Sequence, residues 1–75
     1  MIEWLNVGTS GNKAYSATGD GWLAKVFRAP GGYNAQVYFN DGTNETTSHP
    51  TPEIAKEYVR GVLIGKGLIQ SEGNG

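Results

Sequence analysis

Residues 22–40 decide the fold, and they read WLAKVFRAPGGYNAQVYFN. Aromatic and β-branched residues dominate the runs 22–29 and 33–40, which favours strands. Pro30-Gly31-Gly32 separates the two runs, and it favours a turn because Pro supplies a fixed φ and Gly the positive φ that follows. The stretch therefore predicts an antiparallel hairpin.

Two further strands are expected before this hairpin, over residues 2–7 and 13–18, with glycine-rich turns after each. After the hairpin, Asp41-Gly42 is a pair favoured in tight turns. Residues 43–47 could then pair back as a short polar edge strand, and the sequence alone leaves this pairing open.

One helix is expected near the C-terminus. Thr51-Pro52-Glu53 places a hydroxyl cap, a proline at the first helical position and an acid near the positive end of the helix dipole. An apolar stripe follows at helical spacing, and Gly65-Lys66-Gly67 predicts the end of the helix. The stripe consists of Ile54, Ala55, Tyr58, Val59, Val62 and Leu63, and we expect Lys56, Glu57 and Arg60 to face water.

These elements predict an α+β fold, an antiparallel β-meander of four to five strands packed on one C-terminal helix. The 75 residues suit one domain over residues 1–70, with a disordered tail over 71–75. A chain of this length buries roughly 60% of its unfolded surface, so the core is expected to be thin.

Alternation along the two central strands predicts which side chains face the helix. One set is mostly apolar: Trp22, Ala24, Val26, Tyr33, Ala35, Val37 and Phe39. A single helix covers one side of a sheet, so the other side should present Lys25, Phe27, Gln36 and Tyr38. The ordinary interpretation of this face is that Phe27 and Tyr38 form a stabilising cross-strand pair, with Leu23 under a loop.

Catalytic chemistry is poorly supported by the composition. His49 is the single histidine, there is no cysteine, and adjacent residues such as Ser48 and His49 point in opposite directions in an extended chain. We expect His49 to lie in an exposed loop. Neither catalytic residues nor a metal site nor a cofactor is expected, and the protein is not expected to be an enzyme.

Charge and targeting signals suit a cytoplasmic protein. Six basic and seven acidic residues are scattered along the chain and give a net charge of −1. Without a basic stripe, nucleic-acid binding becomes a less favoured class. The absence of cysteine suits a reducing compartment, and neither a signal-peptide pattern nor a membrane-spanning apolar run is expected.

Residues 21–39, GWLAKVFRAPGGYNAQVYF, and 51–58, TPEIAKEY, together resemble the ethylene-response-factor and integrase arm-binding DNA-binding domains. The resemblance implies a three-stranded sheet packed on one helix, with the free sheet face reading the DNA major groove. At the matching positions this chain carries Lys25, with Arg28 at the strand end. Gln36, Tyr38 and Asn40 occupy positions where that family is more basic.

A looser resemblance, of type and not of motif, is to the small accessory proteins of phages and mobile elements, many of which bind and block a host protein. We therefore expect a non-catalytic binding module, accessory or inhibitory, that contacts a protein partner through the free sheet face. The alternative is a DNA-binding domain using the same face, and a homodimer is an additional option. The predicted binding residues are Lys25, Phe27, Arg28, Gln36, Tyr38 and Asn40.

Overall fold

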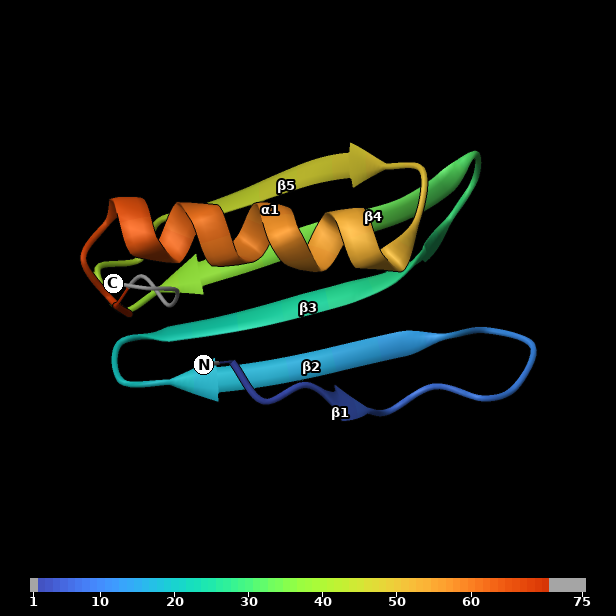
Figure 1. Ribbon diagram of the computed structural model, residues 1–75, viewed down its shortest axis with the longest axis horizontal. Coiled ribbons are helices and arrows are strands. Elements are labelled where there is room, and N and C mark those ends of the chain that lie inside the picture. The colour runs from blue at the N-terminus through green and yellow to red at the C-terminus, as the bar shows by residue number, and fades with distance from the viewer. Residues whose placement is uncertain (1, 71–75) are drawn as a thin grey trace.

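Five strands precede one helix in the computed structural model, which describes residues 2–70. The elements are β1 (Leu5–Asn6), β2 (Ala14–Gly19), β3 (Trp22–Ala29), β4 (Gly32–Phe39), β5 (Asn44–His49) and α1 (Pro52–Gly65). Each strand pairs antiparallel with the next, so the order in the sheet is the order in the chain. The predicted α+β meander is confirmed (Figure 1).

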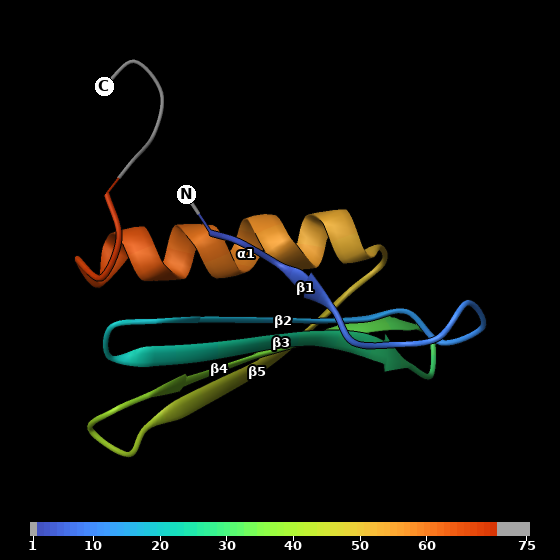
Figure 2. The same ribbon diagram turned by 90° about the horizontal axis from the view of Figure 1, so that it is seen from below.

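The molecule has two layers, with α1 lying across one face of the sheet. Figure 2 shows the layers edge on, with the helix above the strands and no second helix below them in residues 2–70. The sheet is twisted, and β4 and β5 diverge from α1 toward the β4–β5 turn (Figure 2). One face is therefore covered and the other is free.

The central hairpin forms as its sequence predicts, with a two-residue connection. Ala29 lies opposite Gly32, and the register continues to Trp22 opposite Phe39. Gly31 has a φ of +85°, which fits the third position of a type II turn. The turn thus fixes which side chains of β3 and β4 lie side by side.

The strand that the sequence left open exists and is longer than 43–47. β5 pairs with β4 over six residues, from Asn44 to His49. The preceding turn is held by Asp41, whose Oδ1 accepts hydrogen bonds from the backbone N–H of Thr43 at 2.9 Å and from its hydroxyl at 2.6 Å. A side-chain acceptor of this kind is typical of aspartate in turns.

The expected strand over residues 2–7 is wrong in its extent, because only Leu5–Asn6 pairs with β2. Ile2 and Trp4 pack instead against the core cluster, beside the helix. Figure 2 shows this segment rising from the sheet toward α1. This packing removes apolar surface of two large side chains from water, which is favourable.

Both ends of α1 match their sequence signals. Thr51 has extended geometry, with φ −137° and ψ 157°, and its Oγ1 accepts from the N–H of Ile54 at 3.1 Å. At the other end, Gly67 has a φ of +74°. The N–H of Gly67 bonds to the carbonyl of Ile64, and that of Leu68 to the carbonyl of Leu63, which is the Schellman arrangement.

The core lies between α1 and the covered face, and its members are apolar. They are Ala17, Trp22, Ala24, Val26, Ala35, Val37, Ala55, Val59 and Leu63. The predicted helix stripe needs one correction, because Ile54 is 48% exposed. Ile54 lies in the first turn of α1, one helical turn before Tyr58, and is not among the residues packed against the core.

No helix within residues 2–70 is long and apolar enough to cross a membrane. The tail expected over residues 71–75 lies outside the described residues.

Candidate functional site

The candidate site is the free face, which we define as the side of the sheet opposite α1. The strand registers arrange its side chains from β2 to β5 in three rows. The rows are Thr18–Leu23–Tyr38–Asn44, then Ser16–Lys25–Gln36–Thr46, then Ala14–Phe27–Asn34–Ser48. Each row holds uncharged polar groups at one or both ends and an apolar or amphipathic side chain on β3.

Burial alternates along β3 as the sequence predicts. Trp22, Ala24 and Val26 are buried on the covered face, whereas Lys25 is exposed and Phe27 is half-buried on the other. Because α1 packs on one side, the side-chain parity of a strand residue decides its exposure. Trp22 and Val37 therefore belong to the core, and Phe27 and Tyr38 do not.

Four of the predicted binding residues come together on the free face. Lys25 lies directly opposite Gln36, and the hydroxyl of Tyr38 donates to Oε1 of Gln36 at 3.0 Å. Tyr38 is 38% exposed. This hydrogen bond joins the Tyr38 phenol to the Gln36 side chain on the same face of β4.

The expected Phe27–Tyr38 cross-strand pair is wrong. Phe27 lies opposite Asn34, and Tyr38 lies opposite Leu23, so the Lys25–Gln36 row separates the two aromatic rings. Leu23 is therefore part of the free face and is half-buried there, not under a loop. The two rings flank a central lysine instead of packing on one another.

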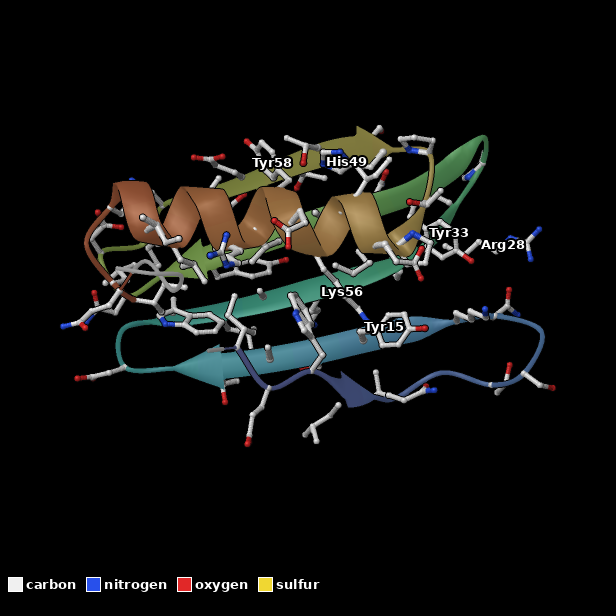
Figure 3. All side chains as sticks on the ribbon, viewed as in Figure 1. Tyr15, Arg28, Tyr33, His49, Lys56 and Tyr58 are labelled. Carbon is white, nitrogen blue, oxygen red and sulfur yellow. The ribbon has the colours of Figure 1, made fainter. Side chains whose placement is uncertain are left out.

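Arg28 and Asn40 do not join this group. Arg28 has the parity of the covered face, at the end of β3, and its guanidinium donates to the carbonyl of Gly11 at 3.3 Å. Asn40 lies in the turn after β4 and lines a small hollow with Lys66 and Leu68 at the end of the helix layer. Figure 3 shows Arg28 projecting from the end of the sheet.

The sequence interpretation missed the apolar residues at the β1 side of the free face. Val7 is 61% exposed, and its N–H bonds to the carbonyl of Ala14, which places it beside the Phe27 row. A hollow of about 260 Å³ lies here, lined by Val7, Ala14, Ser16, Lys25 and Phe27 among others. Glu3, Leu5 and Val7 are two residues apart, which places them on one face of an extended chain. The two apolar members of this set were the signal that could have predicted the apolar patch.

A second surface lies between α1 and the N-terminal segment. The ammonium of Lys56 is 3.7 Å from the ring centre of Tyr15 and 5.9 Å from that of Trp4, within the range of cation–π attraction. The expectation that Lys56 faces water is wrong, since its stem covers the seam between the helix and β2 (Figure 3). Partial burial of this kind is typical of a long amphipathic side chain.

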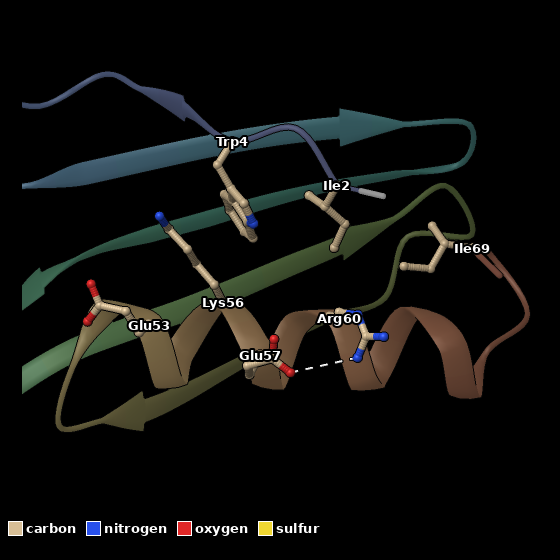
Figure 4. Close-up of a pocket in the computed structure, with 7 residues that line it drawn as sticks. All are labelled: Ile2, Trp4, Glu53, Lys56, Glu57, Arg60 and Ile69. Atoms are coloured by element: carbon tan, nitrogen blue, oxygen red, sulfur yellow. Dashed lines mark ion pairs between the residues drawn. The ribbon is translucent and has the colours of Figure 1, made fainter. Parts of the chain in front are cut away.

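Beside this seam lies a pocket of about 380 Å³, lined by Ile2, Trp4, Ile69 and four charged helix residues (Figure 4). Two of these four charges neutralise one another, because Arg60 forms a 3.7 Å ion pair with Glu57. The pair is largely exposed, and such pairs contribute little to stability. We read this pocket as the open end of the core.

His49 lies in β5 and not in a loop, which corrects the sequence expectation. Its ring is half-buried, lies 4.9 Å from the Tyr58 ring, and its Nε2 is 2.7 Å from the hydroxyl of Thr47. The Tyr58 hydroxyl donates to Oε1 of Glu45 at 3.0 Å, and this hydrogen bond, with burial, raises the pKa of Tyr58. The cluster joins β5 to α1 (Figure 3).

Ser48 points to the opposite side and donates to the side chain of Asn34, as expected for a neighbour of His49 in a strand. Within residues 2–70, no three His, Asp or Glu side chains gather as a metal site would require. Comparison with protein-family models, with curated proteins and with solved structures gives no match to this chain.

Proposed function

We propose that the protein is a small non-catalytic binding module that contacts another protein through the free face. The observation that carries this proposal is the row structure of that face, where Leu23, Phe27 and Tyr38 surround Lys25 with no covering layer from residues 2–70. Apolar and aromatic groups with a polar surround are the composition of protein interfaces. An accessory or inhibitory role would follow from occupying a partner's surface.

The charge of the face favours a protein over a nucleic acid. Of the six Lys and Arg residues, Lys25 is the one that the registers place on the free face. Phosphate binding requires several cations, because each neutralised phosphate needs one. A single lysine among amides and hydroxyls instead suits an apolar partner surface with one carboxylate facing Lys25.

Affinity capture with matched variants tests the proposal. We expect a protein captured from the native host's extract to be lost with Phe27→Ala/Tyr38→Ala and retained with Ile54→Ala. Ile54 is the control because it is an exposed apolar side chain on the helix layer. Urea denaturation of each variant verifies folding, and an unchanged set of captured proteins with the double variant contradicts the proposal.

The DNA-binding alternative has its own test. Binding to duplex DNA at low salt that weakens with Lys25→Ala and Arg28→Ala, and that falls steeply with added salt, would support it. Capture that persists in high salt points to the apolar protein interface. The two outcomes separate the candidate functions because electrostatic phosphate contacts are screened and apolar contacts are not.

A further inference from the structure

The outer edge of β5 is an unpaired strand edge of six residues. The sheet has β1 at one end and β5 at the other, within the part of the chain that the structure describes. β1 offers only two strand residues, Leu5–Asn6, after the chain has descended from the helix layer (Figure 2). β5 pairs continuously with β4 on its inner side. Its outer side is the better template for another strand.

The hydrogen-bond pattern shows which residues of β5 face outward. The N–H of Phe39 bonds to the carbonyl of Thr43, and this pair continues the β4–β5 register. Bonded and non-bonded pairs alternate along an antiparallel ladder. Hence alternate residues from Thr43 to His49 bond to β4. The backbone groups of Asn44, Thr46 and Ser48 point to the open edge.

The edge has few of the features that prevent strand addition. Proteins usually protect edges with charged side chains, especially lysine, with inward-pointing charges, with proline or with a bulge. The six residues NETTSH contain neither lysine nor proline, and their register with β4 advances one residue at a time without a bulge. The one charged strand residue, Glu45, points toward the helix layer, where Tyr58 binds it. The outward-facing backbone is free to accept a strand.

We infer that β5 pairs antiparallel with β5 of a second copy of this chain, about a two-fold axis through Thr46. In this register Thr46 lies opposite Thr46 of the second copy, and Asn44 lies opposite its Ser48. All three outward-facing residues on each chain then exchange both backbone hydrogen bonds. Threonine pairs directly opposite one another stabilise a sheet.

The neighbouring registers are less favourable for reasons visible in the sequence of β5. A two-fold axis through Glu45 places two carboxylates directly opposite and leaves Ser48 unpaired. An axis through Thr47 leaves Asn44 unpaired. In the register through Thr46, Glu45 lies opposite Thr47 of the second copy, so like charges are not opposed. The symmetry of the three outward residues therefore selects one arrangement.

Such a dimer would have a single continuous sheet. The two-fold axis stands perpendicular to the sheet, so both helices lie on one side and both free faces on the other. The dimer goes beyond the proposed binding function, since it concerns the edge and would double the free face. An interface of one strand pair is small, and small interfaces are weak and reversible.

Sedimentation equilibrium of the full chain tests the inference through a proline substitution. We expect the mass to rise from 8.0 kDa toward twice that value with concentration up to the millimolar range. Thr46→Pro should hold the mass at 8.0 kDa, because proline removes the outward N–H and is tolerated at an open edge. Thr46→Val, which keeps that N–H, should dimerise like the original chain.

A monomer at every concentration overturns the inference, and so does a Thr46→Pro protein that dimerises as well as the original chain. Cysteine cross-linking checks the register independently of the proline variant. In a bonded antiparallel pair the Cα atoms are about 5.5 Å apart, within disulfide range. Thr46→Cys should cross-link under mild oxidation and Asn44→Cys should not. Equal cross-linking of the two overturns the register.

The two proposals fail separately. Phe27→Ala/Tyr38→Ala should leave the sedimentation behaviour unchanged, because neither residue touches the β5 edge. Thr46→Pro should leave capture of a protein partner by one chain intact. Loss of dimer and loss of capture are thus assigned to different surfaces.

Discussion

The two faces of the sheet carry residues that are neighbours in the chain but differ in their exposure to solvent. Val26 and Val37 are 0% exposed on the covered face, whereas Tyr38, the next residue along β4, is 38% exposed on the free face. The backbone is the same for both, so the helix alone creates the difference. Stability should therefore reside in the covered face, and the free face should tolerate change.

The largest expected effect is from Leu63→Ala. Leu63 is 0% exposed at the helix–sheet contact, and its truncation should lower the free energy of unfolding by about 2–5 kcal/mol. Leu23→Ala makes the same chemical change on the free face and should cost clearly less. Urea denaturation measures both. Equal losses would show that the free face is also core.

Gly19→Ala should disturb the covered face without removing any atom. A Cβ at Gly19 would lie 2.4 Å from Nε1 and Cε2 of Trp22, so the indole must move. Overpacking of this kind costs about 1–3 kcal/mol. We expect a shifted Trp22 emission in a Trp4→Phe background. Thr18→Ala, one residue earlier on the free face, should change stability by less than about 0.5 kcal/mol.

Thr51→Ala tests how much the stability of α1, the helix that covers the sheet, depends on its N-cap. Its hydroxyl satisfies the N–H of Ile54, and its loss should lower the free energy of unfolding by about 0.5–2 kcal/mol. Thr51→Ser keeps the acceptor and should restore most of the stability. Thermal melts followed at a helical circular-dichroism wavelength measure the change. Identical melts for the alanine and serine variants would exclude a capping contribution.

The smallest effect concerns Asp41, in the turn that leads into β5. The hydroxyl and then the backbone N–H of Thr43 lower the pKa of Asp41 below its ordinary value of 3.8. Because the folded pKa is the lower one, this stabilisation is present above pH 3.8 and is lost as the pH falls through the lowered pKa.

Thr43→Val removes the hydroxyl and keeps the N–H, so it should raise the pKa of Asp41 part of the way back. A carboxyl-detected NMR titration measures both proteins. An unchanged pKa in Thr43→Val would show that the hydroxyl does not hold this turn.

Local signals were enough where the deciding interactions are local. Thr51-Pro52-Glu53 located the start of α1, and the runs in residues 22–40 located the central hairpin. Register was harder to predict, because it depends on the length of the connection. Pro30-Gly31 forms the turn and Gly32 belongs to β4, so Phe27 lies opposite Asn34 and not beside Tyr38.

The sequence patterns predicted wrongly the surroundings of segments and side chains whose contacts are with residues far away in the chain. Residues 2–7 were expected to form a strand, yet Ile2 and Trp4 pack against the core beside α1 and only Leu5–Asn6 pairs with β2. The sequence pattern places Lys56 on the solvent side of the helix, but in the structure its ammonium lies over the ring of Tyr15. His49 has no local signal that its ring would pack against the ring of Tyr58.

By itself the sequence determined the order of the strands, the place of the helix and the side-chain parity that separates core from free face, because period and capping act within a few residues. The tertiary structure decided which rows form on the free face and which edge stays open. The rows and the open edge depend on the strand register and on which part of the sheet the helix covers. Both are set by contacts between residues far apart in the chain.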